Sequence, residues 1–157
     1  MARPQKKGLL YFPFDTDFFA DLKIRALSAR YGSDGLIFYI WLLAEIYREN
    51  GYYIVWNEDS EDAAIASLGL SEGSMKQIMT FLASRSLIVE ITLASSDTII
   101  TSPNIQKRYQ EAKSLRREII VDCEIWLLNE EETASFIKVT QNSDKYSKNH
   151  NKSVKNE

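Results

Sequence analysis

Residues that build redox centres and metal sites are nearly missing from this sequence. It has one cysteine, Cys123, and one histidine, His150, in 157 residues. A lone cysteine cannot form an internal disulfide. Because His150 lies in a polar tail, no histidine is left for a catalytic triad or a zinc cluster in the folded part. We therefore expect no catalytic residues, no metal site, no bound cofactor and no enzymatic activity.

Long hydrophobic runs are absent as well. The longest apolar run, residues 36–44, has about half the length that a transmembrane helix needs. The N-terminal stretch MARPQKKGLL lacks the apolar centre and the small-residue cleavage site of a signal peptide. The sequence therefore predicts a cytoplasmic protein without membrane contact.

Basic residues do not outnumber acidic ones, and the formal net charge is −3. That charge alone is a poor indicator of nucleic-acid binding, so the distribution matters more. Residues 102–117 carry five Lys and Arg against one acidic residue, whereas residues 118–135 carry six acidic residues and no basic one. Any contact with DNA would thus depend on local segments.

The periodicity of apolar residues, together with the turn and capping residues between the apolar segments, predicts a series of short helices and strands. In order, these are helices over 22–31 and 36–49, a strand over 52–56, helices over 57–69 and 71–85, strands over 87–93 and 98–101, and a helix from 103 to about 117. This order is typical of a winged helix. The predicted fold class is mainly α (α+β), a winged helix-turn-helix with a small β-hairpin wing and an additional C-terminal helix.

Two glycines in Gly32-Ser33-Asp34-Gly35 raise the question of a phosphate-binding loop. A P-loop requires a lysine and a Ser or Thr at the head of the next helix, and Leu36 follows here instead. Ser33 or Asp34 is better interpreted as a helix N-cap, with Gly32 reversing the chain before it.

Three parts of the chain follow from these patterns. We expect residues 1–118 to form the winged-helix domain with an N-terminal arm, and residues 119–140 to form an acidic helical extension. Residues 141–157 are rich in Asn, Ser and Lys and have almost nothing apolar to bury, which predicts a disordered polar tail.

Two polar helix faces are candidates for DNA contact. The helix over 71–85 places Lys76, Gln77, Thr80 and Ser84 opposite its apolar stripe, with Arg85 at its end. Such a face suits the major groove. The helix that follows Pro103 places Gln106, Lys107, Gln110, Lys113 and Arg117 on its outward side. That strip suits a phosphate backbone. An ordinary solvated surface would have the same composition in both cases, so both interpretations stay open.

Aromatic residues are dense in the N-terminal stretch YFPFDTDFF, which contains Phe12, Phe14, Phe18 and Phe19. Most of them are expected in the core. The remainder could form an interface between copies of the chain, because aromatic residues concentrate in interface cores. These four phenylalanines are the predicted oligomerisation residues.

Several stretches in the same order resemble the N-terminal winged-helix domain of DnaD-like phage and prophage replication proteins, of the replisome-organiser or primosome type. They are YFPFDTDFFAD, RALSARYGSDGLIFYIWLLAEIY, NGYYIVWNED and SPNIQKRYQEA, within residues 9–118. The resemblance implies a non-enzymatic factor that contacts DNA, self-associates and meets replication proteins such as a helicase loader or an initiator. Nothing after Arg117 resembles the second, helical DNA-binding domain of DnaD-type proteins.

The predicted function is therefore a DNA-binding or scaffolding module in phage-type replication initiation. One alternative is a self-associating interaction module with little DNA affinity. Another is a winged-helix transcription regulator, which would require a palindromic operator matched to a symmetric dimer.

Overall fold

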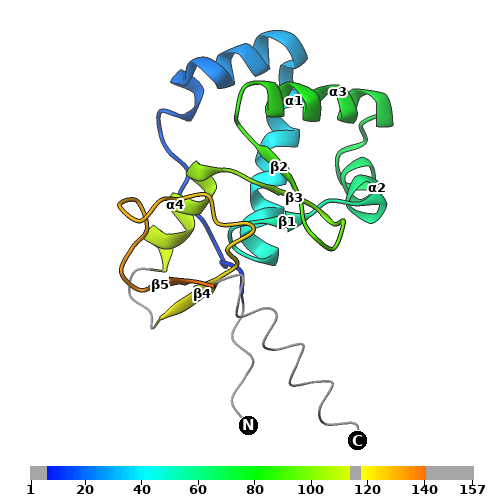
Figure 1. The fold of residues 1–157 in the computed structure, drawn as a ribbon. Helices are drawn as coiled ribbons and strands as arrows, with labels where there is room; N and C mark the ends of the chain where they lie inside the picture. The colour runs from blue at the N-terminus through cyan, green and yellow to red at the C-terminus, as the bar shows by residue number, and fades with distance from the viewer. Residues whose placement is uncertain (1–6, 114–117, 141–157) are drawn as a thin grey trace, which may run out of the picture.

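The computed structural model describes residues 7–113 and 118–140, and it is an α+β structure (Figure 1). The predicted tail, residues 141–157, lies outside the described residues. The elements are the 3₁₀ helix η1 (Phe18–Ala20), α1 (Leu22–Glu49), β1 (Ile54–Val55), α2 (Glu58–Leu68), α3 (Glu72–Ser84), β2 (Val89–Thr92), β3 (Thr98–Thr101), α4 (Pro103–Ala112), β4 (Ile119–Val121) and β5 (Ile137–Val139). No described helix is both long enough and apolar enough to cross a membrane.

Helix α1 is the central element, and it bends at a glycine. Asp21 caps its start by accepting hydrogen bonds from the amides of Lys23 (2.8 Å) and Ile24 (3.3 Å). Gly32 has φ 59° and ψ −146°, which is outside the helical region and costs glycine little. Gly32 therefore divides α1 into two helical segments, which agrees with the two helices predicted over 22–31 and 36–49. Phe38, in the second half, is fully buried.

Local capping signals set the limits of α2 and α3. The Asn57 side chain accepts from the amide of Ser60 (3.1 Å), and Gly69 ends α2 in the left-handed conformation. Ser71 then caps α3 by accepting from the amide of Ser74 (3.1 Å). Capping residues and a glycine stop thus join the two helices through the short turn that the sequence predicts.

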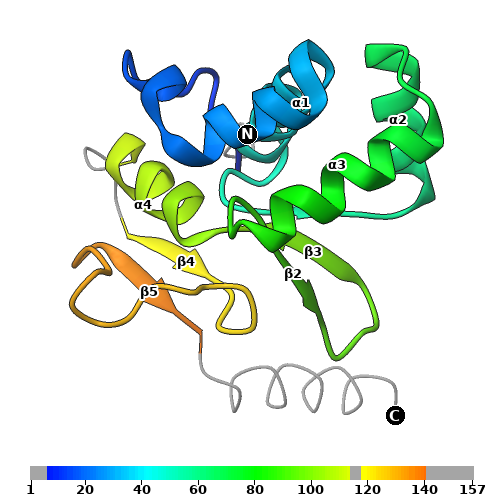
Figure 2. The ribbon, with the colours of Figure 1, turned by 90° about the horizontal axis from the view of Figure 1, so that it is seen from above.

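A small antiparallel sheet has the strand order β1-β3-β2, with Ile54 opposite Ile100 and Ile91 opposite Ile99. Figure 2 shows helices α1, α2 and α3 on one side of strands β2 and β3. Ile99 and Ile100 are both buried, because β3 is the middle strand and packs on both faces. The predicted hairpin over 87–101 is confirmed.

The segment 119–140 is not helical, so the predicted acidic helical extension is wrong. It contains β4 and β5, which pair in parallel with Ile119 opposite Ile137. The run Ile-Ile-Val at 119–121 is β-branched and favours a strand, a signal that the acidic residues around it obscured. Helix α4 also ends at Ala112, earlier than predicted. Figure 2 shows β4 and β5 beside α4.

Candidate nucleic-acid interface

The outward face of α3 is open. Its apolar stripe is buried as predicted, at Met75, Ile78, Met79 and Leu82. Its polar residues are exposed, at Lys76, Gln77, Thr80 and Ser84, and so is Arg85, which ends the helix. The structure therefore brings together all five residues that the sequence predicts on this helix.

A shallow hollow of about 390 Å³ lies over this face, and we call it the α3 hollow. Its lining comes from α3 and from Arg30 and Tyr31 of α1. Among the described residues that line it there is no carboxylate, and every polar side chain in the lining can donate a hydrogen bond. Arg30 was missed by the sequence analysis, because the crossing of α1 over α3 has no local signal in the sequence. A surface of donors without acids suits a polyanion.

The donors of the α3 hollow differ in their present partners. Lys76 Nζ pairs with Glu72 of the same helix at 2.9 Å, and the hydrogen bond to Glu72 raises the pKa of Lys76. Thr80 Oγ1 donates to the Lys76 carbonyl (2.9 Å) and Ser84 Oγ donates to the Phe81 carbonyl (2.7 Å). Within residues 7–113 and 118–140, no group hydrogen-bonds the side-chain amide of Gln77. Gln77 is thus the donor and acceptor most available to a base edge.

Helix α4, the second predicted DNA-contacting face, is covered by residues 118–140. Gln106, predicted outward, is fully buried. Its amide donates to Thr101 Oγ1 (3.1 Å) and to the Ile125 carbonyl (2.9 Å), and it accepts from the Leu127 amide (2.6 Å). Gln110 donates to the Glu132 carbonyl (2.7 Å). These glutamines bind the chain's own backbone, so they are unavailable to DNA.

The cations of α4 are engaged in the same way. Lys107 Nζ pairs with Glu132 at 2.9 Å. The prediction that Lys113 faces outward is wrong, since it is 9% exposed and its Nζ lies 6.0 Å from the centre of the Tyr109 ring. The helix ends at Ala112, so Lys113 turns back over that ring instead of continuing the outward strip. Arg117 lies outside the described residues.

The hairpin tip at residues 94–97 has no basic residue, and it contacts an acid. The amide of Ala94 donates to Glu124 Oε2 at 3.1 Å. A carboxylate at this tip opposes an approaching phosphate. The tip therefore contributes nothing favourable to a DNA interface.

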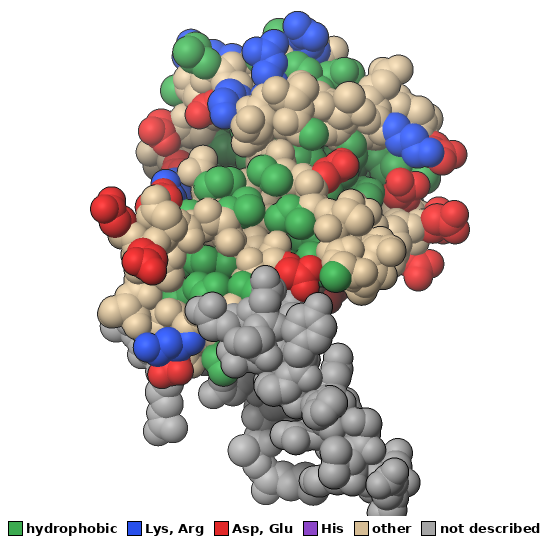
Figure 3. Space-filling view, viewed as in Figure 1, with side chains coloured by type: hydrophobic (Ala, Val, Ile, Leu, Met, Phe, Trp, Pro, Cys, Tyr) green, Lys and Arg blue, Asp and Glu red, His purple; other side chains and the backbone are tan. Residues whose placement is uncertain are grey.

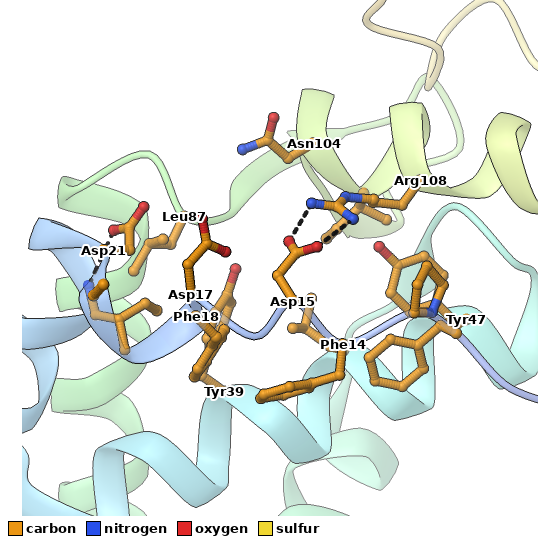
Figure 4. A pocket seen from close by; sticks show the side chains of 16 residues that line it. Phe14, Asp15, Asp17, Phe18, Asp21, Tyr39, Tyr47, Leu87, Asn104 and Arg108 are labelled. Atoms are coloured by element: carbon orange, nitrogen blue, oxygen red, sulfur yellow. Dashed lines mark hydrogen bonds and ion pairs between the residues drawn. The ribbon is translucent and has the colours of Figure 1, made fainter.

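A second hollow, of about 410 Å³, separates the N-terminal arm from α4, and we call it the arm hollow (Figure 4). Asp15 of the arm and Arg108 of α4 form a two-pronged ion pair, in which Arg108 Nη1 lies 2.8 Å from Asp15 Oδ1 and Nη2 also contacts Oδ2. This hydrogen bonding raises the pKa of Arg108. Asp17 and Asp21 also line this hollow.

The four predicted oligomerisation residues divide into two pairs. Phe12 stacks on Tyr47 with ring centres 4.7 Å apart, and Phe18 packs against Tyr39 at 6.2 Å. Phe14 and Phe19 are 46% and 58% exposed. Burial raises the pKa of Tyr39 to about 12, as expected for a hydroxyl enclosed by the packing of the arm. The arm is thus anchored by two rings and presents two others to solvent.

Basic side chains gather on one part of the face drawn in Figure 3. Figure 3 shows Lys and Arg side chains gathered over the N-terminal half of α1, at the top of the view, and Asp and Glu side chains along both flanks. This half of α1 contains Lys23, Arg25 and Arg30. Among the described residues, no group of three or more His, Cys, Asp or Glu could hold a metal ion.

Comparison with known proteins assigns the family. The family model described as Lin1244/Lin1753-like, N-terminal, matches residues 11–105. The chain belongs to this family. The match spans all of α3 and ends one residue before Gln106.

One relative comes from Listeria innocua serovar 6a (strain ATCC BAA-680 / CLIP 11262) and is named "Uncharacterized phage-related protein Lin1244/Lin1753". It is 33% identical over 136 residues, which are 87% of this chain and 44% of the relative. The chain thus spans less than half of that relative's length. No solved structure matches the chain.

Proposed function

We propose that this chain is a winged-helix module of a phage protein, that it binds duplex DNA through α3, and that it acts in the initiation of phage DNA replication. The element order from α1 to β3 and the strand order β1-β3-β2 support the winged helix. The phage-related name of the relative supports the phage context. The resemblance to DnaD-like proteins is the reason for placing the function in replication.

The observation that carries the DNA proposal is the carboxylate-free α3 hollow. In a major groove, Gln77 can donate to and accept from one base edge, and Lys76 can exchange Glu72 for a base or phosphate. Thr80 and Ser84 would redirect their hydroxyls from backbone carbonyls to phosphates. Helix α4 stays outside the interface, because the chain's own backbone binds the side chains of Gln106 and Gln110.

The test measures fluorescence anisotropy of labelled duplex, single-stranded and forked DNA at two salt concentrations. Gln77→Glu places a negative charge in the α3 hollow and is expected to weaken duplex binding by about tenfold or more. Ser67→Glu on exposed α2 adds the same charge elsewhere, and it is expected to change binding by less than about threefold. Equal affinities for these two variants would contradict an interface on α3.

A second candidate function is self-association through the arm, which the exposed rings of Phe14 and Phe19 favour. The centres of these two rings lie 6.4 Å apart, so the rings present one continuous apolar surface. Light scattering of the wild type and of Phe14→Ser with Phe19→Ser tests it. A wild-type oligomer that the double variant converts to monomer is expected, and a monomeric wild type would contradict this candidate.

A further inference from the structure

We propose that Arg30 and Arg85, both held at the Phe81 ring, form a binding site for phosphate groups, namely those of the nucleic-acid backbone beside α3. This inference rests on the proposed function and assigns its phosphate contacts. Of the basic strip predicted on α4, the described members Lys107 and Lys113 contact Glu132 and the Tyr109 ring, and the hairpin tip at residues 94–97 has no basic residue.

Two guanidinium groups meet at one aromatic ring. The central carbon of Arg30 lies 5.4 Å from the centre of the Phe81 ring, and that of Arg85 lies 5.3 Å from it. Phe81 itself is only 5% exposed, so these groups and Tyr31 cover it. Cation–π attraction holds each guanidinium at the ring and restricts its rotamers. An anion would therefore meet two cations whose positions are already limited.

These two arginines differ from the others that the structure describes. Arg48 pairs with Glu45, and Arg108 pairs with Asp15. Arg25 donates to the Phe19 carbonyl. In residues 7–113 and 118–140, neither the Arg30 side chain nor the Arg85 side chain has an ion pair or hydrogen bond. Two unneutralised cations at one ring repel each other, and a bound phosphate would offset that repulsion.

The place of the pair along α3 matches the position of a DNA backbone. The helix has 13 residues, so it is about 20 Å long. The major groove is only about 12 Å wide. When α3 crosses the groove at an angle, a helix of this length brings its end to the groove edge, where the phosphates are. Arg85 stands at that end, and the two donor forks of the pair fit phosphate oxygens.

The experiment measures duplex affinity as a function of salt for Arg30→Gln, Arg85→Gln and Arg25→Gln, with thermal melts to confirm folding. Loss of one phosphate contact should lower the slope of log K against log salt by about one. We expect this decrease for Arg30→Gln and Arg85→Gln, and an unchanged slope for Arg25→Gln. Arg30→Lys keeps the charge but loses the fork, so it should nearly retain the slope while affinity falls several-fold.

Failures of the two proposals are distinguishable. If the wild type binds duplex DNA and the Arg30 and Arg85 variants match Arg25→Gln, the phosphate site is wrong and the function of α3 stands. If the wild type binds no DNA, the proposed function fails. Titration with inorganic phosphate, followed by NMR of the arginine side-chain N–H signals, then decides the site. If the N–H signals of Arg30 and Arg85 both shift at lower phosphate concentrations than the signal of Arg25, the phosphate site is supported. If they do not, the site is overturned.

Discussion

Helices α3 and α4 have similar polar faces in the sequence and opposite surroundings in the structure. Each carries Lys, Gln and a small hydroxyl residue or a second Gln on the side away from its apolar stripe. The face of α3 is open to solvent, whereas that of α4 is covered by residues 118–140. A helical wheel separates polar from apolar residues, but it does not tell solvent from a second layer of backbone.

The difference has a chemical cause. Irregular backbone between β4 and β5 has amide and carbonyl groups that need partners. Long amide side chains on α4 supply them, as Gln106 does for Ile125 and Leu127. The acidic residues of segment 118–135 also contact α4, because Glu132 pairs with Lys107. Among the described residues, no comparable acidic segment lies on α3, so Arg85 at its end and Arg30 of α1 stay available.

The largest expected effect concerns the covered face. Gln106→Leu removes three hydrogen bonds and leaves the buried groups of Thr101 and Ile125 and the part-buried amide of Leu127 without that partner. We expect the free energy of unfolding to fall by about 3 kcal/mol, measured by urea denaturation. The matched change on the open face, Gln77→Leu, should cost less than about 0.5 kcal/mol. Similar losses in both variants would remove the distinction between the two helices.

A smaller effect is expected where the arm meets α4. Asp15→Asn removes the charge that pairs with Arg108, and both partners are partly exposed, so stability should fall by less than about 1 kcal/mol. The arm should loosen locally, seen as faster hydrogen exchange of the Leu9 amide, which bonds the Tyr47 carbonyl at 2.6 Å. Asp17→Asn is the control, because Asp17 is exposed in the same arm. Unchanged exchange at Leu9 in Asp15→Asn would show that the rings alone hold the arm.

The smallest effect concerns the pairing of Lys107 with Glu132. The hydrogen bond from Lys107 lowers the pKa of Glu132 below its usual 4.5. A lowered folded pKa means that the carboxylate stabilises the fold above the unfolded pKa and loses this contribution as the pH falls through the folded value. Glu132→Gln should therefore shift the urea midpoint slightly at pH 7 and not at pH 3. Glu131→Gln, on an exposed neighbour, should show no such pH dependence.

Local signals made much of this fold predictable from the sequence. Asn57, Ser71 and Gly69 set helix ends through contacts within a few residues, so the predicted limits of α2 and α3 agree with the structure. The burial of Gln106 was not predictable in this way, because it depends on contacts with Ile125 and Leu127, which are distant along the chain.

The candidate site shows the same division between local and distant contacts. Residues 76–85 were predicted from one helix, while Arg30 joins them only because α1 crosses α3. The strands β4 and β5 were missed because their pairing is parallel and links segments that are separated along the chain.

The hydrogen bonds of the buried Gln106 side chain also bear on which segment of this chain can be moved into another protein and stay folded. The family match ends at residue 105, yet the hydrogen bonds of the next side chain reach residues 125 and 127. A gene fusion or recombination junction at residue 105 would remove Tyr109 and Trp126, whose rings pack with the Tyr52 ring in one cluster. A junction after Val139 would leave that cluster whole, so an exchangeable cassette of this protein extends at least to β5.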